Sequence, residues 1–313
     1  MTRALVALNP RAGGGRAGER WQRVRPSLSG RYACQQASLD ADGRWVSIVE
    51  RAVTDGVRLF FAAGGDGTVN LLLNALRRTR GQVPLERLVL GAVGLGSSND
   101  FHKPIGRTAA GFPIRHDLGA AALRDVCRAR YSDAAGQVHE RCFLVSASVG
   151  VTAEANALFS GNDRLQRALR RRCFSLALVS AAVRSILSYR DFDAELEWQL
   201  DGRHIVRRSR ITSLSLLKTP HLSGSLRFDT PAAGDDGLLG ANLCEAMTRA
   251  QTLGVLVDLG RGRFRGRRGR SHWQTPHLVL ACARPFALEF DGEVVTTTHA
   301  EFEVLHERIG VCA

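Results

Sequence analysis

Residues 62–70, Ala62-Ala63-Gly64-Gly65-Asp66-Gly67-Thr68-Val69-Asn70, decide the fold. Residues 57–61 before them are apolar except for Arg58 and predict a short buried strand, and apolar residues at helical spacing in 69–76 predict a helix after them. Glycines let the backbone turn sharply and approach a ligand closely, and the amides at a helix start favour an anion. A carboxylate such as Asp66 is repelled by phosphates unless a divalent cation lies between them. We therefore interpret the stretch as a nucleotide-phosphate site with Mg²⁺ bridged to Asp66; a tight turn without a ligand is the alternative.

Length and composition allow a folded protein of one large domain or two ordinary ones. The 313 residues are 44% hydrophobic and 23% charged, which excludes a disordered chain. No apolar stretch approaches the about 18 residues of a membrane-spanning helix, and the N-terminus carries no signal-peptide pattern. The seven cysteines form no CxxC pair. We therefore expect reduced thiols in a cytoplasmic protein, with metal binding by cysteine disfavoured.

The formal net charge of +13 comes almost entirely from arginine, because lysine occurs only at positions 103 and 218. An arginine-biased genome explains this, and so does attraction to an anionic surface. The densest basic run is 261–270, in which Phe264 stands among arginines. It is either a solvated surface loop or a contact with phospholipid headgroups, which we favour over nucleic acid.

Two further strands are followed by glycine-rich loops. Residues 5–8 lead into Asn9-Pro10-Arg11-Ala12-Gly13-Gly14-Gly15-Arg16, and residues 88–93 lead into 94–101. Repeated strand, loop and helix is typical of an α/β domain with a mainly parallel sheet, in which such loops meet at the carboxyl ends of the strands. Arg11 or Arg16 would then pair with phosphate oxygens. The spacing in 9–16 matches no standard phosphate motif, so a flexible N-terminal loop is the alternative for that stretch.

The pattern changes near residue 135. A helix that includes the Arg170-Arg171-Arg172 cluster is predicted over 165–189, and another at 247–259. Short β-type runs separated by turn residues are predicted at 193–200, 204–209, 211–217, 238–243, 277–282, 286–290 and 302–305. Such runs are typical of an antiparallel sandwich. The predicted fold is an N-terminal three-layer α/β nucleotide-binding domain at 1–132 and a C-terminal β-sandwich domain at 133–295. The last segment, 296–313, is expected to be able to pack back onto the first domain.

Five motifs occur in a recognisable order: Asn9-Pro10 with Gly13 to Gly15, Gly64-Gly65-Asp66-Gly67-Thr68, Gly96-Ser97-Ser98-Asn99-Asp100-Phe101, Asp235-Asp236-Gly237-Leu238 and Asp291-Gly292-Glu293. The set resembles the diacylglycerol kinase catalytic-domain family, especially its soluble bacterial lipid kinases, with sphingosine kinases as relatives. The GGDGT element alone is shared with NAD kinases. The resemblance implies a nucleotide-binding α/β domain followed by a β-sandwich lipid-substrate domain, with the active site in the cleft between them.

The resemblance also implies roles for particular residues. The residues implied to hold ATP are Asn9, Pro10, Arg11, Ala12, Gly13, Arg16, Ser38, Gly64, Gly65, Asp66, Gly67, Thr68, Val69, Asn70 and Ser97. Catalytic Mg²⁺ would be held by Asp66, Asp100 and Asp117, partly through water. Glu293 would be the base that takes the proton of the substrate hydroxyl, with Asp291 as the other candidate. A structural Mg²⁺ would be bound by the Asp236 side chain and the carbonyl groups of Ala233 and Leu238.

Each of these assignments has a plainer alternative, and the sequence departs from the family in places. Asp-Gly-Glu occurs in hairpin turns, and Asp-Gly alone in simple turns. Leu71 follows Asn70 where relatives often have glutamate. Val151-Thr152 and His221-Leu222-Ser223-Gly224 differ from relatives in the expected substrate domain. The acceptor is therefore the least constrained part of the prediction.

The sequence thus predicts an ATP- and Mg²⁺-dependent lipid kinase of phospholipid biosynthesis that phosphorylates a lipid hydroxyl, such as that of diacylglycerol. We expect a cytoplasmic protein that associates peripherally with anionic membranes, without a transmembrane segment and without nucleic acid as a partner. A homodimer is compatible with the sequence. The alternatives are a kinase that resembles NAD kinases and acts on a soluble dinucleotide, and a non-catalytic nucleotide-binding module.

Overall fold

The computed structural model describes residues 1–39, 42–161, 174–200 and 202–313. The chain divides into two compact units. The first comprises Met1–Val126 and His306–Ala313, and the second comprises Cys127–Leu305. The domain limits expected from the sequence, 1–132 and 133–295 with 296–313 returning to the first domain, stay a prediction. In the part of the chain that the structure describes, no helix is long and apolar enough to cross a membrane.

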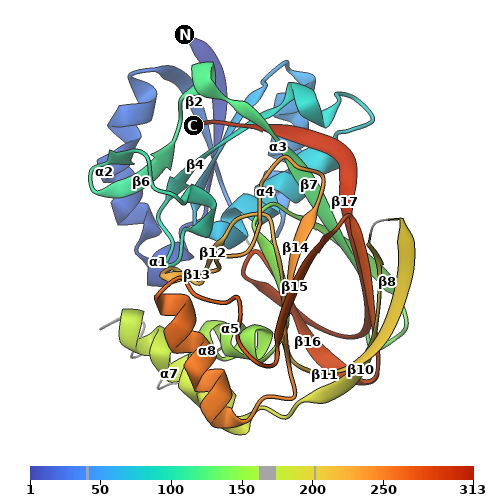
Figure 1. The fold of residues 1–313 in the computed structure, drawn as a ribbon. Coiled ribbons are helices and arrows are strands. Elements are labelled where there is room, and N and C mark those ends of the chain that lie inside the picture. The colour runs from blue at the N-terminus through green and yellow to red at the C-terminus, as the bar shows by residue number, and fades with distance from the viewer. Residues whose placement is uncertain (40–41, 162–173, 201) are drawn as a thin grey trace. The chain divides into compact units, whose positions relative to one another are not determined.

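The first unit is built on parallel strands (Figure 1). Their order is β2 (Tyr32–Ser38), β1 (Thr2–Leu8), β3 (Leu59–Gly64) and β4 (Val89–Gly94), and each neighbouring pair is parallel. The remaining edge of β4 pairs with the end of β17 (Glu293–Val311) in parallel and with β6 (Phe112–Arg115) in antiparallel fashion. Every residue of β3 is buried, which explains its continuous apolar sequence.

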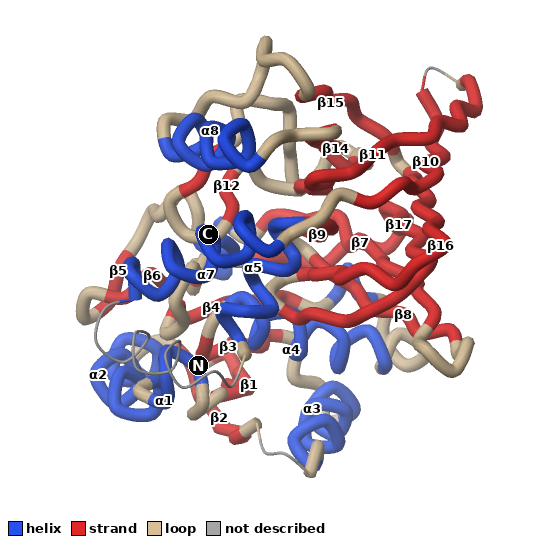
Figure 2. Tube along the Cα trace, turned by 90° about the horizontal axis from the view of Figure 1, so that it is seen from below, coloured by secondary structure: helices blue, strands red, loops and turns tan. Residues whose placement is uncertain are grey.

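Helices cover the first sheet, and α2 (Ala17–Ser29) and α3 (Arg44–Thr54) lie on opposite sides of β1 and β2 (Figure 2). Trp21, Val24 and Leu28 of α2 share one core with apolar side chains of the strands. The helix that the spacing in 69–76 predicts is α4 (Asp66–Arg78), and the predicted apolar positions are buried as expected. The other described elements of this unit are α1 (Ala12–Gly15), β5 (Thr108–Ala109) and 3₁₀ turns at Leu85–Arg87, Asp100–His102 and Leu118–Ala120.

Antiparallel strands form the second unit. Its path is β15 (Arg270–Thr275), β14 (Leu239–Glu245), β11 (Arg203–Leu217), β10 (Phe192–Leu200), β16 (His277–Phe290) and β17, with β7 (Ala122–Ser132) and β8 (Val138–Phe143) beyond β17. Strand β9 (Ser146–Gly150) pairs with both β11 and β16, as β10 does. Two different strands therefore connect β11 to β16. One apolar core, which includes Leu196, Leu214, Leu280 and Phe302, runs through these strands.

The other described elements of the second unit are the helices α5 (Val151–Ser160), α7 (Phe174–Ser188) and α8 (Arg249–Gly260) and the hairpin of β12 (His221–Leu222) and β13 (Leu226–Arg227). The helix predicted at 247–259 is confirmed as α8. Of the helix predicted at 165–189, the structure confirms 174–188, and the Arg170-Arg171-Arg172 cluster lies outside the described residues. The separate strands predicted at 277–282 and 286–290 are wrong, because β16 is one strand with an irregularity between Ala281 and Phe286.

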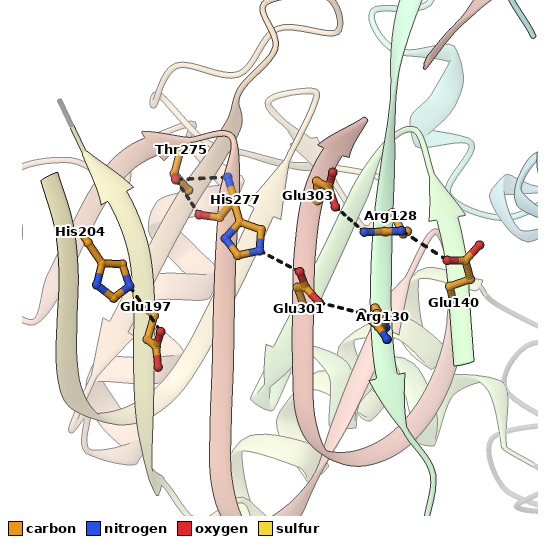
Figure 3. A network of polar contacts seen from close by, with 9 residues as sticks. All are labelled: Arg128, Arg130, Glu140, Glu197, His204, Thr275, His277, Glu301 and Glu303. Carbon is orange, nitrogen blue, oxygen red and sulfur yellow. Dashed lines mark hydrogen bonds and ion pairs between the residues drawn. The ribbon is translucent and has the colours of Figure 1, made fainter. Parts of the chain in front are cut away.

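Ion pairs link neighbouring strands of the second unit (Figure 3). Arg128 of β7 contacts both Glu140 of β8 and Glu303 of β17. Glu301 of β17 accepts from His277 of β16 at 3.0 Å, and this contact is the main cause that lowers the pKa of the Glu301 carboxyl. Such partly exposed pairs contribute little stability each. These pairs lie on the face of the sheet that is exposed to solvent, so β17 carries charged residues on that face and apolar residues on the other.

Candidate nucleotide-binding and catalytic sites

The loops after β3 and β4 contact each other through their backbones. The Gly64 carbonyl accepts hydrogen bonds from the amides of Leu95 (2.8 Å) and Gly96 (3.1 Å). A methyl group at Gly96 would lie 2.3 Å from the Gly65 Cα. Only glycine permits this approach, so the contact between the two loops explains why glycine stands at these positions.

The loop after β1 joins the other two. The Asn9 side chain donates to Thr68 Oγ1 (3.1 Å), and the Asn9 amide donates to the Ala63 carbonyl (3.0 Å). At Gly13 the backbone has φ of +58°, and a methyl group would lie 2.4 Å from the Leu95 carbonyl oxygen. The prediction that three glycine-rich loops meet at the carboxyl ends of the strands is therefore confirmed.

Arg20 is a residue of this loop cluster that the sequence did not indicate. Its guanidinium donates from Nη1 to the Leu95 carbonyl at 2.7 Å and so ties α2 to the loop after β4. Burial is the main cause that lowers the pKa of Arg20, and Arg16 adds to the effect. Helical spacing alone does not distinguish this arginine from its solvated neighbours.

Asp66 begins α4 and connects two of the loops. Its Oδ1 accepts the Phe101 amide at 2.9 Å, which places the carboxylate at the residue that follows Asp100. Thr68 and Asn70 are each 1% exposed. Both side chains are engaged within the protein, because the Thr68 hydroxyl accepts from the Asn9 side chain and the Asn70 Oδ1 accepts from the Asn74 amide one turn along α4.

The other two predicted Mg²⁺ ligands have basic partners. Asp100 pairs with Lys103 at 2.6 Å, and both side chains are largely buried. Asp117 pairs with Arg107 at 2.9 Å and caps a 3₁₀ turn through the Gly119 amide. Among the described residues, no three His, Cys, Asp or Glu side chains gather into a group that could hold a metal. Carboxylate oxygens still suit Mg²⁺ that arrives with a nucleotide, because the phosphates then supply the other ligands.

Several predicted contacts of a nucleotide lie at the rim of this loop cluster. Arg11, Arg16 and Ser97 are exposed, and Ser38 ends β2 opposite Leu8 of β1. His102 is buried close to Asp100, and burial lowers the pKa of its imidazole to about 4. The ring is therefore neutral at neutral pH and adds no charge to the site.

In the second unit, the Asp291 side chain is buried and holds two turns together. Its carboxylate accepts three backbone amides, those of Leu144 (2.9 Å), Val145 (3.0 Å) and Ser146 (3.0 Å), and the residue is 3% exposed with φ of +45°. All these contacts hold the turn between β8 and β9 against the turn between β16 and β17. Asp291 is therefore engaged as an acceptor, which distinguishes it from Glu293.

Glu293 is exposed and starts β17, two residues after this anchor. The buried Glu289 was not predicted: its carboxylate accepts the Ser148 hydroxyl at 2.6 Å and the Gly292 amide at 2.7 Å. The sequence feature that could have indicated this buried carboxylate is that Glu289 is the single acidic residue in the otherwise apolar run 286–290. Glu289 and Asp291 together fix the backbone from which the Glu293 side chain projects.

The predicted structural Mg²⁺ ligands contact a lysine instead. Lys218, directly after β11, donates from Nζ to Asp236 Oδ1 and to the Leu238 carbonyl, each at 2.8 Å. Asp236 Oδ1 also accepts the Leu238 amide at 3.1 Å. The predicted metal ligands were oxygens of Ala233, Asp236 and Leu238. The Lys218 ammonium group already occupies two of them, those of Asp236 and Leu238, so these residues do not fit a bound Mg²⁺.

An apolar cavity of about 200 Å³ lies within the second unit. Side chains of α5, α7 and α8 line it, together with residues of the strands and of the β12–β13 hairpin. They include Val151, Ala155, Ile186, Leu222, Leu256 and Phe264. Phe264 is the aromatic residue of the arginine run, and it is buried against Phe228. It therefore lines the cavity, whereas Arg261, Arg263, Arg265 and Arg268 of the same run are exposed.

Comparisons with known proteins agree with the motifs. Residues 3–124 match the family described as diacylglycerol kinase catalytic domain. A protein of Xanthomonas euvesicatoria named "Probable lipid kinase YegS-like" is 28% identical over 277 residues, which cover 86% of this chain and 82% of that protein. A diacylglycerol kinase of Bacillus subtilis is 25% identical over 254 residues, 81% of this chain and 77% of that protein. The crystal structure of a diacylglycerol kinase from Bacillus anthracis aligns with a TM-score of 0.66 at 17% identity, covering 99% of this chain and 96% of that one, and so shows a shared fold. Over residues 3–124, the chain is thus similar to the diacylglycerol kinase catalytic domain family.

Proposed function

We propose that the protein is a lipid kinase that transfers the γ-phosphoryl group of ATP to a hydroxyl of a lipid such as diacylglycerol. The apolar cavity of the second unit carries this proposal, because an acyl chain needs an apolar wall and a soluble dinucleotide does not. The similarity of residues 3–124 to the diacylglycerol kinase catalytic domain family supports the kinase activity. The proposal keeps the predicted architecture, in which a three-layer α/β domain binds the nucleotide and a β-sandwich domain binds the lipid.

The nucleotide phosphates lie at the three converging loops of the first unit. The glycine backbones there leave room for phosphate, and the start of α4 favours negative charge. The exposed guanidinium groups of Arg11 and Arg16 are available to pair with phosphate oxygens. Asp66 would hold Mg²⁺, which neutralises phosphate charge when it is bound, and Asp100, whose Oδ1 pairs with Lys103, would contact the ion through water. Arg20 and Asn9 keep the loops in place through the contacts described above.

Glu293 takes the proton of the attacking hydroxyl. Phosphoryl transfer needs the acceptor to be positioned and deprotonated as it attacks, and a carboxylate within reach can do this. The Asp291 carboxylate is occupied by three backbone amides, so it positions the turn.

The exposed arginines of 261–270 hold the enzyme at an anionic membrane surface, an attraction that salt weakens. A cytoplasmic enzyme of phospholipid biosynthesis fits these roles, and a homodimer stays a prediction.

The direct test is phosphoryl transfer from labelled ATP. The protein is incubated with labelled ATP, Mg²⁺ and vesicles of phosphatidylglycerol that contain diacylglycerol, and in parallel with NAD. We expect the label in an organic-phase product only when the lipid acceptor is present. Label in NADP, or no product with diacylglycerol or a total lipid extract, would refute the proposal.

A bulky residue in the cavity is expected to weaken the use of long acyl chains. Leu256 of α8 lines the cavity, whereas its neighbour Val257 is 53% exposed. Leu256→Trp should lower kcat/KM for long-chain diacylglycerol roughly 10-fold or more, because each displaced methylene is worth about 0.8 kcal/mol of transfer free energy. Short-chain diacylglycerol should be affected less. Val257→Trp is the matched control, and equal loss in both variants would contradict the assignment of the cavity.

A further inference from the structure

The Lys218 side chain lies at the point where a cation would join the Asp236 loop to the adjoining strands. The residue follows β11 directly, and its amide donates to the Val145 carbonyl at 2.9 Å. Its Nζ lies 2.8 Å from both Asp236 Oδ1 and the Leu238 carbonyl oxygen. One ammonium group thus binds a carboxylate and a backbone carbonyl, the two kinds of oxygen that a hard cation prefers.

Burial makes this contact strong and specific. The Lys218 side chain is fully buried, with 0% exposure, whereas the Asp236 side chain is 27% exposed. A buried ammonium group is tolerated only when it is paired and hydrogen-bonded, since an unpaired charge in such a place costs several kcal/mol. Asp236 supplies the opposite charge, and Leu238 satisfies a further N–H group.

A divalent ion and this ammonium group exclude each other. Mg²⁺ needs near-octahedral oxygen ligands at about 2.0–2.1 Å, and the lone pairs that it would use accept hydrogen bonds from Lys218 and from the Leu238 amide. The second carboxylate oxygen of Asp236 accepts from Gln274 at 3.2 Å. A doubly charged ion beside a buried ammonium would also be repelled.

The identity of the residue fits the role. The chain has 43 lysines and arginines, of which only positions 103 and 218 are lysine. Arginine presents a planar fork of donors, whereas lysine presents a compact point charge with three donors, which can replace a metal ion among oxygens. A position that requires the compact cation explains why lysine stands here in a chain whose basic residues, apart from Lys103, are otherwise arginine.

We propose that the Lys218 ammonium group replaces the divalent cation in the Asp236 loop, so that this loop is ordered without metal. The contact joins the end of β11 to the turn that enters β14, next to the strand pair Leu217 and Gly240. The inference does not depend on the proposed lipid substrate, because it concerns only how the second unit is held together.

The first experiment uses the unaltered full chain without nucleotide. The protein is dialysed against EDTA, and its thermal unfolding is followed with and without millimolar MgCl₂, together with its metal content after dialysis against Mg²⁺. We expect the same unfolding temperature in both conditions and no Mg²⁺ retained in the second unit. A loss of stability in EDTA that Mg²⁺ restores, with one bound ion per chain, would overturn the proposal.

The second experiment removes the ammonium group. Lys218→Ala is expected to lower the unfolding temperature by roughly 10 °C, because it leaves a carboxylate without its buried partner. Mg²⁺ should restore part of this loss, since Asp236 and the Leu238 carbonyl then become available as ligands. Lys218→Ala/Asp236→Asn is the control and should not respond to Mg²⁺. An unfolding temperature of Lys218→Ala equal to that of the unaltered chain would refute the proposal; if the variant does not fold, the first experiment decides.

Discussion

Asp66→Asn is expected to reduce phosphoryl transfer by about 10³-fold or more, the loss typical when an essential electrostatic contact to a transferring phosphoryl group is removed. The carboxylate is the group of the GGDGT loop that would hold Mg²⁺, and an amide carries no charge to do so. The amide oxygen can still accept the Phe101 amide, the 2.9 Å contact that connects the two loops. The fold should therefore survive, and the loss should appear in activity and in the affinity for ATP with Mg²⁺.

The control for this variant is Asp55→Asn, which also removes one negative charge from the first unit at an exposed position after α3. It should leave activity and unfolding temperature near those of the unaltered protein. Titration calorimetry with ATP and Mg²⁺ separates binding from chemistry. Activity of Asp66→Asn within a few-fold of the unaltered protein would exclude Asp66 as a metal-binding group.

The sequence was sufficient where local patterns carry the structure. The strand before Gly64 and the helix after Asp66 follow from apolar runs and spacing, and they are observed as β3 and α4. The meeting of three glycine-rich loops followed from one general property of parallel sheets, that their strands end at the same edge. Backbone contacts such as that between Gly65 and Gly96 then give these glycines a physical reason.

The sequence was insufficient where a residue is defined by a distant partner. Nothing near Lys218 in the chain indicates that its ammonium group meets Asp236, because the strand pairing that joins them is tertiary. The same holds for Phe264, whose arginine-rich surroundings indicate a surface loop although the ring is 1% exposed. The sequence predicted only residues 302–305 of the 19-residue strand β17. Its charged residues do not indicate a strand by themselves, because their partners, as for Glu301 and Glu303, lie on neighbouring strands (Figure 3).

The assignment of the base can be separated from the anchoring of the turn. Glu293→Gln is expected to lower the phosphorylation rate by about 10²- to 10⁴-fold, the usual contribution of a general base, without changing the unfolding temperature. Its side chain is exposed, so the folded state does not depend on it. Glu140→Gln, an exposed glutamate of β8 in the same unit, is the matched control and should retain activity.

Asp291→Asn should show the opposite pattern. An asparagine has one acceptor oxygen in place of two, and its NH₂ group would face one of the backbone N–H groups of Leu144, Val145 and Ser146, which now donate to the carboxylate. The unpaired buried amide should cost about 1–3 kcal/mol of folding free energy, measured by denaturant unfolding, and activity per folded molecule should fall less than in Glu293→Gln. If Asp291→Asn unfolds like the unaltered protein and loses all activity while Glu293→Gln remains active, Asp291 takes the proton, and the three amides position a base.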